Sequence, residues 1–193
     1  EPTGPRFLTA YPCGQDRPTV SNVNYAPGQS VANLATVKLG TGGRICIYAL
    51  TTTHVIADVA GWYGDAGAPT GSVVTPVAPE RNLDSRVGIG APSGPLPANG
   101  ELQLIATGRT RIPSTGVTAV VLSVAVTDTT GPGYLTVYPC DVDRPTASNV
   151  NYGGPGQTVA NLVVVKLDPA GRYCVFSPTT THVLADVAGY LST

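Results

Sequence analysis

The chain has 193 residues, a net charge of −1 and only 12% charged residues, so it lacks the basic stripe that nucleic acids or anionic membranes attract. No apolar run approaches the roughly 20 residues that a membrane-spanning helix needs. Glycine (23 residues) and proline (18 residues) are abundant, and no helical periodicity is present, which is typical of short strands joined by turns. The composition therefore predicts an all-β protein with no nucleic-acid or membrane partner.

The first part of the chain, residues 1–64, is predicted to consist of short strands with no helix. A hairpin turn is expected at residues 40–43, and residues 65–72, which are rich in small side chains, are predicted to be a linker. The apolar and polar patterns predict five strands, at residues 7–11, 21–25, 31–39, 44–48 and 54–62.

Residues 73–193 are predicted to form a complete unit of about eight strands. Residues 117–127 are apolar at nearly every position, which predicts a central strand covered on both faces. Residues 134–190 (the second copy) repeat residues 7–62 (the first copy) at about two thirds of positions, with one inserted residue. The sequence predicts antiparallel β-sandwich units in tandem, jelly-roll or immunoglobulin-like, with an incomplete first copy.

The first copy has no counterpart of residues 73–127. Folded alone, residues 1–63 would leave apolar strand faces and unpaired edges in water. They could pack against residues 73–191, exchange strands with another molecule, or be completed by an upstream segment. Because residues 65–72 separate the two parts, we expect either a homo-oligomer or an upstream segment that completes residues 1–63.

Each copy contains two cysteines, and four cysteines allow three pairings. Pairing within copies, Cys13 with Cys46 and Cys140 with Cys174, needs no coincidence between copies and should stabilise the fold by roughly 3 to 4 kcal/mol per bridge. Zinc is the alternative, but the chain has no Cys-x₂-Cys spacing and only two histidines. Two disulfides predict an oxidising compartment, so the protein is expected to be secreted or on the cell surface.

Two pairs of histidine and aspartate are candidate catalytic groups. His54 and Asp58, and equally His182 and Asp186, lie four residues apart, which on a straight strand is about 13 Å. A catalytic dyad needs hydrogen-bond contact, so both pairs are interpreted as structural partners of backbone groups or turns. No catalytic residue, metal site or cofactor is predicted, and the chain is not expected to be an enzyme.

A duplicated polar segment is the best candidate for binding. Planar amides, a carboxylate, an arginine and an aromatic ring are groups that hold sugars. The alternative is that Asp and Arg pair to fix the turn, while the Asn side chains cap strand ends. The candidate ligand-binding residues are Asp16, Arg17, Asn22, Asn24 and Tyr25 in the first copy, and Asp143, Arg144, Asn149, Asn151 and Tyr152 in the second.

Five motifs follow one another in the second unit: RNLDSR at residues 81–86, GYLTVYP at 133–139, SNVNY at 148–152, GQTVANL at 156–162 and THVLADVAGY at 181–190. This order resembles modules repeated in secreted and cell-surface proteins of actinobacteria. In that family the first motif usually reads Arg-Leu-Leu-Asp-Thr-Arg, so Asn82 and Ser85 are departures. The resemblance implies an extracellular location and attachment to hydrolases or other surface domains, without a single shared activity.

The sequence therefore predicts a secreted, non-catalytic module that binds carbohydrate, either a cell-wall polysaccharide or an extracellular glycan. The alternative is a structural or assembly repeat of an extracellular surface protein, which self-associates by strand pairing.

Overall fold

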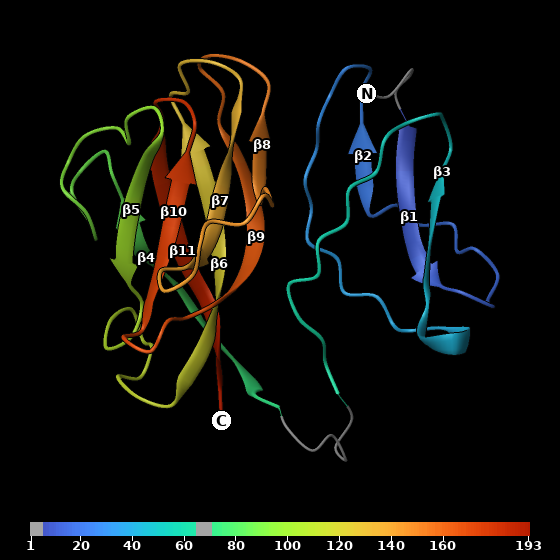
Figure 1. The fold of residues 1–193 in the computed structure, drawn as a ribbon, viewed down its shortest axis with the longest axis horizontal. Helices are drawn as coiled ribbons and strands as arrows, with labels where there is room; N and C mark the ends of the chain where they lie inside the picture. Colours follow the sequence, from blue (N-terminus) through green and yellow to red (C-terminus); the bar gives the residue numbers. More distant parts are fainter. Residues whose placement is uncertain (1–5, 65–70) are drawn as a thin grey trace. The chain divides into compact units, whose positions relative to one another are not determined.

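A computed structural model describes residues 6–64 and 71–193 and divides the chain into two units, Glu1–Ala57 (unit 1) and Asp58–Thr193 (unit 2). The described residues contain eleven strands and one turn of 3-10 helix, so the all-β prediction is confirmed (Figure 1). The division falls inside the segment that was expected to be the last strand of the first copy. Most of the predicted linker at residues 65–72 lies outside the described residues.

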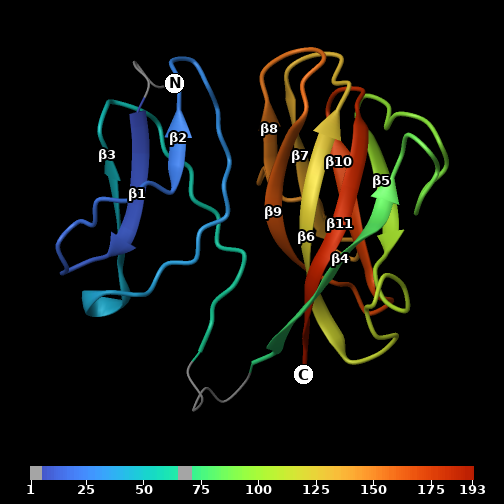
Figure 2. The same ribbon diagram turned by 180° about the vertical axis from the view of Figure 1, so that it is seen from behind.

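Unit 2 contains two four-stranded antiparallel sheets (Figure 1; Figure 2 shows them from behind). The first sheet has the order β5 (Gly100–Ile105), β10 (Arg172–Ser177), β7 (Gly133–Pro139) and β8 (Val150–Tyr152). The second has the order β4 (Val73–Asp84), β11 (His182–Ser192), β6 (Val117–Thr127) and β9 (Val159–Lys166). Numbered within the unit from β4, these orders are 2-7-4-5 and 1-8-3-6, the arrangement of a jelly-roll β-sandwich.

The core of unit 2 lies between the two sheets. Strand β6 contributes Val120, Leu122, Val124 and Val126, which are all fully buried. As predicted, β6 is central, with β11 on one side and β9 on the other. Its second face is not covered, because Ser123 is exposed and a two-layer sandwich buries only one face of each sheet. The prediction that both faces are covered is therefore wrong.

Unit 1 contains one three-stranded antiparallel sheet. Strand β1 (Arg6–Pro12) pairs with β2 (Val23–Tyr25) on one side and with β3 (Ile45–Ala49) on the other, and a 3-10 turn, η1 (Thr41–Gly43), precedes β3. In the sequence match, these strands correspond to β7, β8 and β10. Unit 1 thus contains counterparts of three of the four strands in one sheet of unit 2.

Residues 31–39 and 54–62 do not form strands, contrary to the expectation from the sequence. Their counterparts, β9 and β11, both pair with β6 in unit 2. Residues 6–64 contain no counterpart of β6, so neither segment has a central strand to join. Their composition favours strands, but β propensity depends on cross-strand neighbours. The hairpin expected around residues 40–43 is also absent, since residues 31–39 provide no first strand.

Both predicted disulfides are present, Cys13–Cys46 and Cys140–Cys174, and no cysteine is free. Each joins the segment after one strand (β1 or β7) to a neighbouring strand of the same sheet (β3 or β10). In residues 6–64 and 71–193, no helix has the length and apolar composition needed to cross a bilayer.

Candidate functional site

The outer face of the β5-β10-β7-β8 sheet carries aromatic and polar side chains. Strand alternation sends Leu135 and Val137 of β7 into the core, and therefore places Tyr134, Thr136 and Tyr138 on the opposite face. The residues between β7 and β8 include an exposed stretch, residues 141–146. The outer face therefore combines exposed loop groups with the aromatic side chains of the sheet.

An arginine is stacked on one of the aromatic rings of this face. The guanidinium carbon of Arg144 lies 3.6 Å from the ring centroid of Phe176, which is buried. The ring of Tyr134 lies beside it, with 6.3 Å between the centroids, and is 37% exposed. We call Tyr134, Arg144 and Phe176 the second arginine–aromatic cluster. Stacking fixes the plane of the guanidinium group while leaving its edge for other partners.

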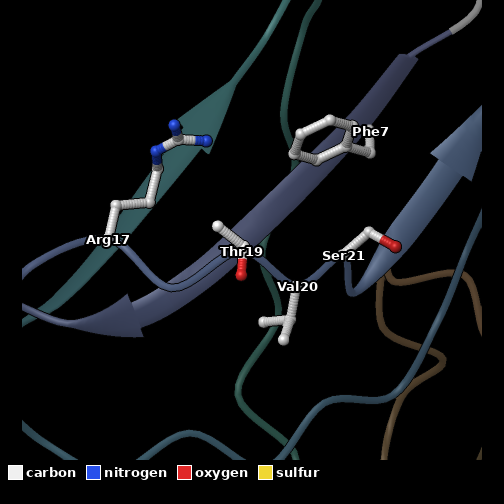
Figure 3. Close-up of a pocket in the computed structure, with 5 residues that line it drawn as sticks. All are labelled: Phe7, Arg17, Thr19, Val20 and Ser21. Carbon is white, nitrogen blue, oxygen red and sulfur yellow. The ribbon is translucent and has the colours of Figure 1, made fainter.

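Unit 1 contains the same arrangement at corresponding positions. Arg17 lies 3.9 Å from the ring centroid of Tyr48, and the Phe7 ring lies 6.3 Å from the Tyr48 ring. We call Phe7, Arg17 and Tyr48 the first arginine–aromatic cluster. An open hollow of about 310 Å³ adjoins it, lined by Phe7, Arg17, Thr19, Val20 and Ser21. Figure 3 shows the Arg17 and Phe7 side chains on one side of the 17–21 loop and Val20 pointing to the other side.

In unit 2, a threonine and two asparagines hold the loop that carries the arginine. The Thr136 hydroxyl donates to the Ala147 carbonyl at 2.8 Å, and the Val137 backbone N–H donates to the Asn149 side-chain oxygen at 2.7 Å. The Asn161 side-chain amide donates to the Asn149 carbonyl, also at 2.7 Å. These three bonds tie the loop to β7 and β9, so the arginine is positioned by groups that are themselves held in place.

The corresponding residues of unit 1 make the same three bonds. Thr9 donates to the Val20 carbonyl at 2.6 Å, and the Ala10 backbone N–H donates to the Asn22 side-chain oxygen at 2.7 Å. Asn33 donates to the Asn22 carbonyl at 2.7 Å. Sequence reasoning did not identify the threonines or the second asparagine of each set, although their identity in both copies was a usable signal.

The structure corrects four of the predicted ligand-binding residues. The side-chain oxygens of Asn22 and Asn149 accept backbone hydrogen bonds, so these amides hold the loop, as in the alternative that the sequence left open. Tyr25 and Tyr152 are only 8% and 4% exposed, so neither ring offers a face to a ligand. The Tyr152 hydroxyl lies 2.8 Å from both Ser177 and Thr179 and thus belongs to an internal network.

The other predicted residues remain at the surface. Asn24 lies opposite Phe7 on the neighbouring strand, and Asn151 lies opposite Tyr134. Directly opposite residues of an antiparallel pair share a face, so each asparagine borders an arginine–aromatic cluster.

The two loop carboxylates, Asp16 and Asp143, are exposed next to Arg17 and Arg144. Among the described residues, none of the salt bridges involves either aspartate or either arginine. The turns are therefore not fixed by the Asp–Arg pairing that the sequence left open, and these charged groups face solvent.

On the edge of the same face, Tyr138 donates a hydrogen bond to Glu101 of β5. Burial and then this carboxylate raise the pKa of Tyr138 to about 12, so the phenol stays protonated and remains a donor at neutral pH. Glu101 itself is exposed. The face thus extends from the arginine–aromatic cluster of unit 2 to an acidic side chain.

The histidine and aspartate pair of β11 bonds to two different partners. Asp186 accepts hydrogen bonds from Arg81, with 3.2 Å to Nη2. The Nδ1 atom of His182 lies 3.0 Å from the Ser85 hydroxyl oxygen, which also accepts a hydrogen bond from the Val183 N–H. Ser85 is only 1% exposed, so its hydroxyl cannot reach a substrate. These contacts are those of structural groups.

The same region contains a buried carboxylate held by two arginines. Asp84 accepts from Arg81 at 2.7 Å and from the Arg86 side chain at 2.8 and 3.0 Å. The hydrogen bond from Arg86 lowers the pKa of Asp84 to about 2, although burial opposes this change. Arg81 and Arg86, the first and last residues of the RNLDSR motif, thus both bind Asp84, and Arg81 also binds Asp186, which joins β4 to β11. We call Arg81, Asp84, Arg86 and Asp186 the ion-pair network.

The protein thus consists of a jelly-roll β-sandwich in unit 2 and a three-stranded sheet in unit 1 that is related to it in sequence. Each unit carries one arginine–aromatic cluster. Neither the protein-family models nor the curated proteins contain a match to this chain. In residues 6–64 and 71–193, no group of three or more His, Cys, Asp or Glu residues is arranged to hold a metal ion. The function is therefore inferred from the geometry of the two clusters.

The two asparagines of the SNVNY motif are expected to respond differently to substitution. Asn149→Ala removes the acceptor of the Val137 N–H and should lower the free energy of unfolding of unit 2 by about 1–3 kcal/mol. Asn151→Ala, the matched control, should change it by less than about 0.5 kcal/mol. Hydrogen exchange of the slowest amides in β6 measures both effects. Equal effects of the two substitutions would contradict the assignment of Asn149 to the loop.

Proposed function

We propose that this protein is a secreted, non-catalytic carbohydrate-binding protein that holds a glycan at each arginine–aromatic cluster. One observation carries the proposal. Both clusters combine an arginine stacked on a ring, a second aromatic side chain and an asparagine on the same face. A single stacked arginine is common in proteins. In this protein, however, both units contain the same surface groups and the same three hydrogen bonds that hold the arginine loop.

The groups of each cluster match the chemistry of a pyranose sugar. The ring of Tyr134, which is exposed, and that of Phe7, which is half-buried, each offer a flat apolar surface for the C–H face of the sugar. The fixed guanidinium edge can donate two parallel hydrogen bonds to neighbouring hydroxyl groups, while Asp143 or Asp16 can accept from them. Because stacking already orders the arginine, binding loses less side-chain entropy than it would with a mobile arginine.

Two features favour a polymeric glycan outside the cell. The chain carries two clusters, so a polysaccharide that reaches both would be held by avidity without any further contact. The two disulfides form and persist most readily in an oxidising compartment, which supports a secreted or cell-surface location. A cell-wall polysaccharide or another extracellular glycan is the expected ligand.

A structural or assembly role is the second candidate, and a separate observation favours it. Ile56, Val59 and Trp62 are 87%, 90% and 69% exposed. Such a run of large apolar side chains is typical of an interaction surface. If this role is correct, light scattering of the full chain will show oligomers that grow with concentration, and the chain will not bind polysaccharides.

Removal of both clusters is expected to abolish retention on polysaccharide. In pull-downs with insoluble cell-wall polysaccharide, Arg17→Ala or Arg144→Ala alone should weaken binding by about 10-fold or more through loss of avidity, and the double variant should not bind. Lys166→Ala is the matched control, because it removes an equal charge from an exposed position of β9.

The variant Arg144→Lys separates stacking from charge. Lysine keeps the positive charge but has no planar group to stack on Phe176 and donate in parallel, so it should bind as weakly as the alanine variant. Binding by the double alanine variant at wild-type strength would overturn the proposal. Full binding by Arg144→Lys would show that charge alone acts.

A further inference from the structure

Residues of the first copy are exposed where identical residues of the second copy are buried. Val59 is 90% exposed, whereas Val187, its counterpart in β11, is fully buried. Val55 is 44% exposed, and its counterpart Val183 is also fully buried. The sequences around these residues are nearly the same, so the difference comes from what lies against them.

In unit 2, the covering element is β6. Val187 lies opposite Leu122, and Val183 lies opposite Val126, in the ladder between β11 and β6. Strand β9 pairs with the other edge of β6 over eight residue pairs. The counterparts of β9 and β11 are residues 31–39 and 54–62, the two segments that do not form strands. Both lack the same neighbour, a strand of the β6 type.

Two polar residues of the first copy point to the same kind of segment. Asp58 corresponds to Asp186, which binds Arg81, and His54 corresponds to His182, which contacts Ser85. Among residues 6–64 there is no counterpart of the RNLDSR motif, and no described salt bridge involves Asp58. A segment like residues 73–127 would supply both the apolar strand and these polar partners.

The amino-acid sequence indicates where such a segment would be joined. Residues 1–5 read Glu-Pro-Thr-Gly-Pro, and residues 128–132, which connect β6 to β7, read Asp-Thr-Thr-Gly-Pro. The match continues directly into β1 and β7. In sequence, residues 1–5 therefore correspond to the connection that follows a β6-type strand.

We propose that the first copy is completed by a polypeptide segment of the residue 73–127 type, joined through residues 1–5, whose β6-type strand inserts between residues 31–39 and 54–62. The two segments then become strands, and the first copy closes into a second jelly roll. A second copy of this chain is a poorer donor, because its own β6 is paired on both edges and its core side chains are fully buried. Removing that strand would open a complete unit.

Hydrogen exchange on a fused protein tests the proposal. Residues 73–127 of this chain are joined directly before Glu1 of the full chain, so that residues 1–5 become the connection. Amides in residues 31–39 and 54–62 should exchange at least about 100-fold more slowly than in the unfused chain, as amides of a stable sheet do. The matched control is the same fusion with Val120→Asp and Val124→Asp in the added segment, which places charges in the core and should give no protection.

The proposal would be overturned if residues 31–39 and 54–62 were already protected from exchange in the monomeric unfused chain, or if they exchanged equally fast in the fusion and in its control. Protection that arises only in a dimer of the unfused chain would also overturn it, because a second copy of the chain would then be the covering element. If the fusion does not fold, a peptide of residues 117–127 is added to the full chain instead. It should slow exchange in both segments, the peptide with the two aspartates should not, and failure of the unmodified peptide would then overturn the proposal.

Discussion

Replacement of Asp84 by alanine is expected to lower the free energy of unfolding of unit 2 by about 2–3 kcal/mol, because it removes a buried carboxylate that accepts hydrogen bonds from two partly exposed arginines. The Asp84 side chain is only 6% exposed and accepts hydrogen bonds from both Arg81 and Arg86. Hydrogen exchange of the slowest β6 amides measures the loss. As a control, Glu80→Ala removes the exposed pair with Arg111 and should cost less than about 1 kcal/mol.

The contribution of Asp84 is also expected to depend on pH. Its pKa is lowered to about 2 in the folded state, so the stabilisation is fully present above the unfolded pKa of about 4 and is lost as the pH falls through 2. The change amounts to about 2 kcal/mol. The difference in stability between the wild type and Asp84→Asn should therefore shrink over this range. A difference that stays constant from pH 6 to pH 2 would contradict the role of the ion-pair network.

Removal of the Cys140–Cys174 disulfide is the second change with a large expected effect. The bridge joins residues 34 apart, for which the chain-entropy model gives a loss of about 4 kcal/mol on replacement of both cysteines by alanine. The same exchange measurement on β6 amides reports the result. The control is the pair Cys13→Ala and Cys46→Ala, which opens a loop of nearly equal length in unit 1. Unit 2 should lose little stability in that variant, and an equal loss would contradict the division into two units.

The fold of residues 73–193 could be predicted from sequence, whereas that of residues 31–39 and 54–62 could not. Strand β6 was identified because a long apolar run can only be a buried strand or helix, and its Val content favours a strand. The prediction that its second face is also buried was wrong. Ala119 and Ala125 made that face look apolar in the sequence, but such small side chains can remain partly exposed. The two first-copy segments have the composition of strands, but a strand also requires a partner, which local sequence does not show.

The candidate site was found only in part, for reasons of geometry. Arg17 and Arg144 were identified, but the rings beneath them lie about thirty residues further along the chain, and no local pattern links them. In the predicted strand at residues 21–25, alternation would place Asn22 and Asn24 on one face. The strand begins at Val23, so Asn22 lies before it and turns its amide toward β1. Strand alternation then places Tyr25 in the interior.

The most direct test of the proposed function is an NMR titration that follows the side-chain Nε–H signals of the arginines as soluble cell-wall glycan fragments are added. The signals of Arg17 and Arg144 should shift and reach saturation, because their guanidinium edges contact the sugar. Those of Arg81 and Arg86 should stay in place, since both groups are held by Asp84. Two results would contradict the proposed function. One is that the signals of Arg17 and Arg144 do not change at glycan concentrations that saturate binding, and the other is that no glycan fragment binds to the protein.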